Sequence, residues 1–295
     1  MSAAAPSVAA LRADAEGLAA PLPALMADAQ HLAQTVMLGS HGRRRSGMGD
    51  EFWQYRPAVP GDEARLIDWR RSGRSDAHFL REKEWQAAQS VLLWVDNSAS
   101  MDFASDKALP TKAARARTLA LALAILLIRG GERVGLSGFS LPPRAGEVQL
   151  IRLAEALCVA QDVPDYGAPE ARGMLPRSRA VFVSDFLGDI GPVTAALTKA
   201  ADRGVRGALC MILDPQEEAF PFDGRTIFES MGGSLTHETL KAGDLRDRYL
   251  ARLAERKAAL ADLCRTTGWQ VHCHHTGEAA AAALLWLYGA LEHDH

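Results

Sequence analysis

The sequence predicts an α/β protein built on a doubly wound, mostly parallel sheet. The first sign is Val91–Val95, a continuous apolar run that ends at Asp96, as a central strand buried on both faces does. The second is a helical segment, Lys112–Arg129, that follows it and stops at Gly130. The third is that strands and helices then alternate with short connections, which implies right-handed crossovers and helices on both faces of the sheet.

The other elements are predicted in chain order from hydrophobic spacing. Ahead of the first strand, residues 7–38 have helical spacing interrupted near Pro21 and Pro23, and residues 41–84 are rich in arginine, glycine and aromatic side chains. We therefore predict an N-terminal helical segment with an arginine-rich arm, 1–84, and an α/β domain, 85–295. In that domain we expect further strands at 133–140, 148–151, 179–184, 207–213 and 269–274, and helices at 153–159, 192–202, 244–267 and 278–291.

The composition is that of an ordinary globular protein. The 295 residues are 48% hydrophobic and 23% charged, and a net charge of -3 provides no basic field for nucleic acid. The four cysteines are widely spaced, which favours free thiols in a reducing compartment. The longest apolar runs, 118–128 and 279–291, are shorter than a membrane-spanning helix, and the first residues lack a secretory signal pattern. We expect a cytoplasmic protein without a transmembrane segment.

Two of the predicted strands end in an aspartate, Asp96 and Asp185. In a doubly wound sheet, ligands bind beyond the carboxyl ends of the strands where strand order reverses, so the two carboxylates converge if their strands are neighbours. Ser98 and Ser100 follow Asp96 at alternate positions and complete a set of oxygen donors suited to Mg²⁺ or Mn²⁺. Water fills some of the coordination positions, and a partner's carboxylate can take one. The residues thus predict a metal site that grips a partner protein.

Other interpretations of the same residues stay open. A loop of Asp and Ser between a strand and a helix is also common turn and N-cap chemistry that needs no metal. The strand-end aspartates would also suit a magnesium-dependent phosphohydrolase, although Ser98 stands where such an Asp-x-Asp enzyme needs a second carboxylate as general acid. Nucleotide and acyl-transfer sites lack support, because the sequence has no P-loop, no GxSxG and no GxGxxG after the first strand.

The segment ahead of the first strand carries a more specific signal. Residues 56–74 read RPAVPGDEARLIDWRRSGR, preceded by GMGDEF at 47–52 and followed by DNSASM at 96–101. In this order the motifs resemble a bacterial family known as domain of unknown function 58, which is similar to von Willebrand A domains. The resemblance covers residues 40–275. It implies a von Willebrand A-like fold of Rossmann-type topology with a strand-end cation site.

The resemblance also implies a partner, because members of that family are typically encoded beside MoxR-type AAA+ ATPases. We therefore expect a non-enzymatic interaction module that acts as an adaptor or partner of such an ATPase in a chaperone-like assembly. One departure matters. The A-domain site normally uses a threonine from the loop region 141–179, which here contains none and offers as small oxygen donors only Asp162, Asp165 and Ser178. A structural A domain with an inactive metal site is therefore a third interpretation.

Two further groups of polar residues have alternative roles. The arm residues form either an ion-pair network that fastens the arm or an exposed surface for an acidic partner. In the tract His272–His275, alternation along a strand puts His272 with His274 and Cys273 with His275, so we do not expect a tetrahedral zinc site. The arm residues concerned are Arg56, Asp62, Arg65, Asp68, Trp69, Arg70 and Arg74. The run Arg43–Arg45 favours solvated surface.

Overall fold

The contacts of the computed structural model divide the chain into two compact units. One consists of Met1–Gly39 together with Gln89–His295 and holds the main sheet; we call it the sheet unit. The other, Ser40–Ala88, is the inserted unit. The residues that the structure describes are 21–37, 46–59, 62–63, 67–73, 78–84, 88–139, 141–159, 164–170, 172–229, 231, 233 and 236–292.

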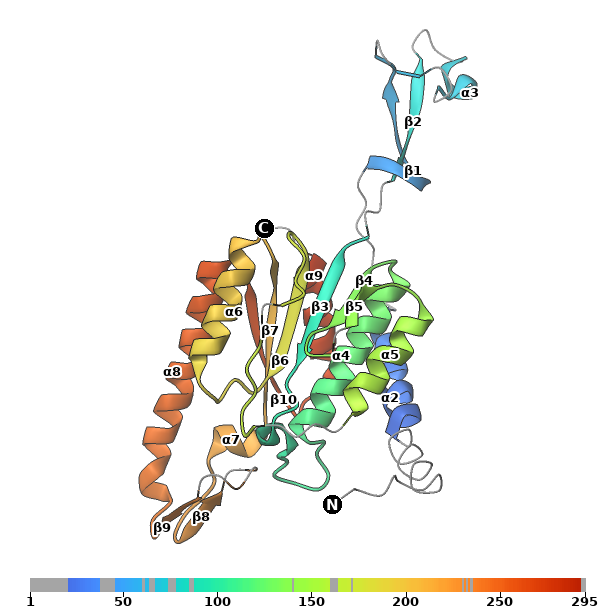
Figure 1. The fold of residues 1–295 in the computed structure, drawn as a ribbon. Coiled ribbons are helices and arrows are strands. Elements are labelled where there is room, and N and C mark those ends of the chain that lie inside the picture. The colour runs from blue at the N-terminus through green and yellow to red at the C-terminus, as the bar shows by residue number, and fades with distance from the viewer. Residues whose placement is uncertain are drawn as a thin grey trace, which may run out of the picture. The chain divides into compact units, whose positions relative to one another are not determined.

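The sheet unit contains a six-stranded sheet in the order β10-β7-β6-β3-β4-β5 (Figure 1). Neighbouring strands run parallel except β4 and β5, which are antiparallel. This confirms the predicted α/β fold with a mostly parallel sheet, and strand order reverses at β3, as in doubly wound folds. The strands are β3 (Ser90–Val95), β4 (Arg133–Leu136), β5 (Leu141–Arg144), β6 (Arg179–Ser184), β7 (Arg206–Leu213) and β10 (Gln270–His275).

Side chains of the central strands alternate between two hydrophobic clusters, one on each face of the sheet. On β3, Val91, Leu93 and Val95 belong to the first cluster, and Leu92 and Trp94 belong to the second. Both faces are therefore covered by helices, which explains why these strands are continuously apolar. The first face carries α4 (Lys112–Arg129), α5 (Glu147–Cys158) and α9 (Ala280–Glu292), and the second carries α6 (Ile190–Asp202) and α8 (Gly243–Thr267) (Figure 1).

The N-terminal helix α2 (Pro21–Met37) belongs to the sheet unit. Its small side chains Ala29 and Ala33 are fully buried in the first cluster, where α2 contacts α4 and α9. The sequence grouped this helix with the arm because the two are continuous in the chain, but the apolar face of the helix finds its partners on α4. The predicted helical residues before Pro21 lie outside the described residues.

The region between β4 and β6 differs from the prediction. Residues 148–151 were expected as a short strand, but they belong to α5, which buries Leu150, Leu153 and Leu157 on one side at helical spacing. The third strand is β5 instead, which the sequence prediction missed. The remaining elements of the sheet unit are the 3₁₀ turn η2 (Ala99–Asp102), the short helix α7 (Pro215–Ala219) and the hairpin β8 (Thr226–Glu229) with β9 (Thr236–Thr239).

The inserted unit is a small β structure. Strand β1 (Ser46–Pro57) pairs antiparallel with β2 (Phe79–Glu84), with irregular register in its first half. The short helix α3 (Trp69–Ser72) follows an isolated bridge between Ile67 and Leu80. The Ser72 hydroxyl accepts a hydrogen bond from the Phe79 amide (2.9 Å), which ties the helix to the start of β2.

Candidate functional site at the carboxyl edge of the sheet

Three parallel strands end in an aspartate at the same edge of the sheet. Asp96 follows β3, Asp185 follows β6, and Asp214 follows β7. Strands β3 and β6 are direct neighbours, as the sequence required for Asp96 and Asp185 to converge, and β7 lies next to β6. All three carboxyl side chains are buried, with exposed fractions of 0–2%. We call this place the carboxyl edge.

The Asp96 carboxylate is held by hydrogen bonds to both of its oxygens. The Ser98 amide donates to Oδ1 (2.8 Å), and the Ser184 hydroxyl donates to Oδ2 (2.6 Å). Burial raises the pKa of Asp96, and these hydrogen bonds act against that rise. The Oγ atoms of Ser98 and Ser100 lie 3.2 Å apart. The loop therefore forms the compact polar turn that the DxSxS pattern suggested.

A second loop, residues 164–170, closes over this turn. The Ala99 amide donates to the Pro164 carbonyl oxygen (3.1 Å), and the Ser100 amide donates to that of Asp165 (2.9 Å). Gly167 passes so close to Asp96 that a Cβ atom at this position would lie 2.2 Å from Oδ1. The region in which A domains normally have a threonine, and which has none here, thus contributes backbone oxygens and a glycine. Asp162 lies outside the described residues, and Ser178 precedes β6 at the opposite end from Asp185.

We expect Gly167→Ala to lower the free energy of unfolding by about 1–3 kcal/mol, because the new methyl group must displace either the loop or the buried carboxylate. Urea unfolding of both proteins measures this. Gly289→Ala is the control, since its Cβ, in the last turn of α9, would meet nothing within 4 Å. Replacing a helical glycine by alanine there is expected to be neutral or stabilising. Equal effects of the two substitutions would contradict the close packing of Gly167 on Asp96.

The second aspartate, Asp185, is paired with a lysine that the sequence analysis did not single out. Lys112 Nζ lies 2.9 Å from Asp185 Oδ2 and 2.6 Å from Glu217 Oε1, and the side chains of Lys112 and Asp185 are each 1% exposed. Burial lowers the pKa of Lys112, but the two carboxylates outweigh burial and raise it overall. Lys112 therefore stays an ammonium ion at the carboxyl edge. For Glu217, burial raises the pKa of the carboxyl group, and the nearby charge of Lys112 acts against this rise.

The third aspartate positions Glu217. Asp214 is the N-cap of α7: its carboxylate accepts from the Gln216 amide (2.8 Å), and the Glu217 carboxylate accepts from the Asp214 amide (2.8 Å). The other Asp214 oxygen accepts from the Ser105 amide (2.9 Å) in the loop after β3. A sequence signal for this existed, because Asp214-Pro215-Gln216-Glu217 has the spacing of a capping box.

The arrangement does not fit the divalent cation that the sequence resemblance implies. Mg²⁺ needs oxygen ligands at about 2.0–2.1 Å and keeps several waters. Here Asp185 accepts the Lys112 ammonium, both oxygens of Asp96 accept hydrogen bonds, and Ser98 is 2% exposed. Within the described residues this leaves no open position for a partner's carboxylate. The ligand roles of Asp96, Ser98, Ser100 and Asp185 stay a prediction that this geometry does not favour.

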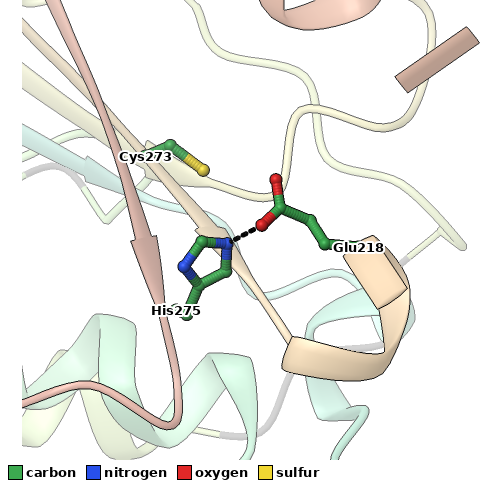
Figure 2. A group of neighbouring side chains, drawn as sticks. All are labelled: Glu218, Cys273 and His275. Carbon is green, nitrogen blue, oxygen red and sulfur yellow. Dashed lines mark ion pairs between the residues drawn. The ribbon is translucent and has the colours of Figure 1, made fainter. Parts of the chain in front are cut away.

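A second polar group, formed by Glu218, Cys273 and His275, lies at the ends of α7 and β10 (Figure 2). Their ligand atoms all lie within 4.8 Å of one another, and His275 contacts the Glu218 carboxylate. Cys273 and His275 share one side of β10 as predicted, whereas Glu218 was missed. The Lys257 ammonium also contacts Glu218. Burial raises the pKa of the Cys273 thiol, which disfavours the thiolate that a metal would need.

The other two histidines of the tract point to the opposite face of β10. His272 stacks on Trp286, with ring centroids 4.8 Å apart. His274 is 1% exposed, and neither ring nitrogen has a hydrogen-bond partner among the described residues; its Nδ1 lies 3.5 Å from Glu278 Oε2. Burial, and then the nearby positive charge of Arg115, lower the pKa of His274 to about 4. This histidine is therefore neutral at physiological pH.

Comparison with known proteins places the chain in a family. The family described as protein of unknown function DUF58 matches residues 54–259. The chain belongs to this family. Uncharacterized proteins of Mycobacterium tuberculosis and Mycobacterium bovis are 27% identical to it over an alignment of 269 positions, which covers 85% of this chain and 82% of theirs. The family match spans residues 54–84 of the arm and both predicted strand-end aspartates, Asp96 and Asp185.

Comparison with solved structures gives two chains with low similarity to this DUF58 chain. The conserved hypothetical protein BatB from Bacteroides thetaiotaomicron has a TM-score of 0.41 and 14% identity, and covers 69% of this chain and 98% of its own. An aerotolerance-related membrane protein from Bacteroides fragilis has a TM-score of 0.41, 13% identity and the same coverage. Among the described residues of this chain, no helix has the length and apolar character needed to cross a membrane.

The arm residues of this DUF58 chain are partly explained by hydrogen bonds within the inserted unit. Asp62 accepts from the Val59 amide (2.8 Å), and Asp68 accepts from the Tyr55 hydroxyl (3.1 Å). These contacts support a structural role for the two aspartates. The Arg70 side chain is exposed. Arg65, Arg74 and Arg43–Arg45 lie outside the described residues, as does the side chain of Arg56.

Trp69 stands out in the inserted unit because a large apolar side chain is left in solvent. It is 59% exposed, and its ring makes an edge contact with His78 at a centroid distance of 5.5 Å. It begins helix α3, next to the exposed Arg70. Tryptophan and arginine are over-represented among the residues that dominate binding energy in protein interfaces.

Proposed function

We propose that this chain is a non-enzymatic protein-binding module that serves as an adaptor for a MoxR-type AAA+ ATPase, and that the inserted unit carries the contact. The exposed Trp69 beside Arg70 is the observation that supports this place for the contact. The identity of the partner rests on the resemblance of residues 47–74 and 96–101 to the DUF58 pattern. The divalent cation is left out of the proposal, because the carboxyl edge does not fit one.

In this role the sheet unit is the support and the inserted unit carries the contact surface. In the sheet unit, the strand-end carboxylates are buried and already paired, so they offer little to a partner. In the inserted unit, hydrogen bonds from Tyr55 to Asp68 and from Phe79 to Ser72 hold both ends of helix α3, which presents Trp69. A side chain held by its backbone in this way loses little conformational entropy on binding.

The test is a binding measurement with a purified MoxR-type ATPase from the same organism. We expect Trp69→Ala to weaken binding by about 30-fold or more, the size of an interface hot spot. Leu240→Ala is the matched control, because Leu240 is a 74% exposed apolar side chain of the sheet unit and its loss is expected to leave binding unchanged. Circular dichroism of both variants checks that the fold is intact. Unchanged binding by Trp69→Ala would exclude this surface.

The same assay addresses the cation. We expect binding in nucleotide-free buffer to be the same with Mg²⁺ and with EDTA, because the proposed contact does not include the carboxyl edge. A loss of binding in EDTA that Asp185→Asn reproduces would instead support a metal bridge between the two proteins.

A magnesium-dependent phosphohydrolase finds less support. Its nucleophile would be Asp96, but this carboxylate is 2% exposed and lies directly beneath Gly167, which leaves no room for a phosphate. A phosphatase assay of the wild-type protein with Mg²⁺ and a general aryl phosphate substrate is expected to show no turnover. Turnover that is lost in Asp96→Asn would restore the enzymatic interpretation.

A further inference from the structure

We propose that the Lys112 ammonium is the resident cation of the carboxyl edge, and that it takes the place that a divalent ion would otherwise occupy. It follows that the wild-type site does not bind Mg²⁺ or Mn²⁺, and that removing this side chain creates such a site. This inference does not depend on the proposed partner.

The geometry around Lys112 is that of a cation between two carboxylates. Its Nζ atom lies 2.9 Å from Asp185 Oδ2 and 2.6 Å from Glu217 Oε1, and the Phe103 ring centroid is 5.8 Å away. A Mg²⁺ ion at the same point would need these oxygens to move inward by roughly 0.5–0.8 Å to reach its usual bond length. A shift of that size is within the reach of side-chain rotation, so the same two carboxylates could serve either cation.

Further oxygen donors belong to the same edge. Asp96 lies near enough to Asp185 for their charges to interact, and the hydroxyls of Ser98 and Ser100 point toward one another at 3.2 Å. Two oxygens bound side by side to one octahedral ion would be separated by about 2.9 Å. Carboxylate oxygens are the ligands that a hard divalent cation prefers, so removing the ammonium would free those of Asp185 and Glu217 to bind one, with water in the remaining positions.

The ammonium group competes well with a dissolved ion because it is covalently attached to the chain next to the two carboxylates. Lys112 is the first residue of α4, and the hydroxyl of its N-cap Thr111 accepts from the Ala114 amide (3.1 Å), which fixes where the side chain starts. The lysine therefore needs no association step, whereas Mg²⁺ has to lose tightly bound water before it can enter. The charges of Asp185 and Glu217 are already partly neutralised, which further weakens the attraction for a second cation.

Two quantities are measured for each protein: Mn²⁺ binding, by electron paramagnetic resonance, and the change of the melting temperature on adding Mn²⁺. The proteins are the wild type, Asp185→Asn, Lys112→Ala, the double variant Lys112→Ala with Asp185→Asn, and the control Lys199→Ala, whose side chain is exposed on α6. We expect the wild type and Lys199→Ala to bind no more Mn²⁺ than Asp185→Asn does. Lys112→Ala is expected to bind one Mn²⁺ and to melt several degrees higher in its presence, and the double variant is expected to lose both effects.

Two results would overturn the inference. One is a wild-type Mn²⁺ site that Asp185→Asn abolishes, because the ammonium would then not exclude the ion. The other is a folded Lys112→Ala protein without added Mn²⁺ affinity, because Lys112 would then be an ion pair unrelated to a cation position. If Lys112→Ala does not fold in metal-free buffer, the readout is refolding: recovery in Mn²⁺ but not in NaCl supports the inference, and failure to recover contradicts it.

Discussion

Replacing Lys112 by methionine is expected to lower the free energy of unfolding by roughly 3–5 kcal/mol, the usual cost of removing one partner from a buried ion pair. Methionine keeps the length of the apolar stem, so the loss reports mainly on charge. The substitution leaves the carboxylates of Asp185 and Glu217 without their cation. Urea unfolding at neutral pH, with the linear extrapolation of both proteins, measures the difference.

Lys199→Met is the matched control for this substitution. Lys199 is exposed on α6, and a surface change of this kind is expected to alter stability by less than about 0.5 kcal/mol. A Lys112→Met protein as stable as the wild type would mean that Asp185 and Glu217 find other partners or become protonated at no net cost. That outcome would remove the charge argument on which the resident cation rests.

The stability of this protein is also expected to fall by on the order of 3 kcal/mol between pH 6.5 and pH 4 because of His274. Its pKa is about 4 in the folded protein and 6.5 in an unfolded chain. A lowered folded-state pKa gives a contribution that is complete above pH 6.5 and is lost as the pH falls toward 4, since the unfolded chain binds the proton first. Unfolding in urea across this pH range measures the slope.

A variant is needed to isolate this effect, because other buried groups titrate in the same range. The raised pKa values of Asp96 and Glu217 act in the opposite direction: their contributions are largest at low pH and are lost as the pH rises through their folded-state pKa values. Subtracting the pH dependence of the stability of His274→Gln from that of the wild type cancels the contributions of Asp96 and Glu217. His237→Gln, at an exposed histidine of β9, is expected to keep the wild-type slope. Equal slopes for His274→Gln and the wild type would contradict the prediction.

The sequence predicts the central strands and helices well because burial on both faces leaves a strong local signal. Val91–Val95 and Lys112–Arg129 are apolar without interruption or at helical spacing, and the helix bounds agree with the structure. The weak point is the short edge strand β5, which contains Pro142 and Pro143. Prolines normally count against a strand, and only the edge position makes them tolerable here. The neighbouring apolar run at 148–151 was then the wrong choice for the third strand.

The candidate site was only half predictable, for a different reason. Strand-end aspartates are visible because a polar residue interrupts a buried run at a place with known geometry. Lys112 gave no such signal, since a lysine at the start of a helix is usually solvated. Its partners Asp185 and Glu217 lie 73 and 105 residues away in the chain. Only the topology of β3, β6 and β7 brings them together.

Because the inserted unit lies within the sequence of the sheet unit, its length can vary without disturbing the sheet. Ser40–Ala88 leaves from Gly39 and returns at Gln89, both of which belong to the sheet unit, so it is a loop insertion of 49 residues and not a terminal appendage. The entropy cost of closing such a loop grows only with the logarithm of its length, about 0.6 kcal/mol for each doubling. The sheet therefore sets little limit on the length of the insertion. What constrains its residues is the structure it forms by itself and the molecules it touches.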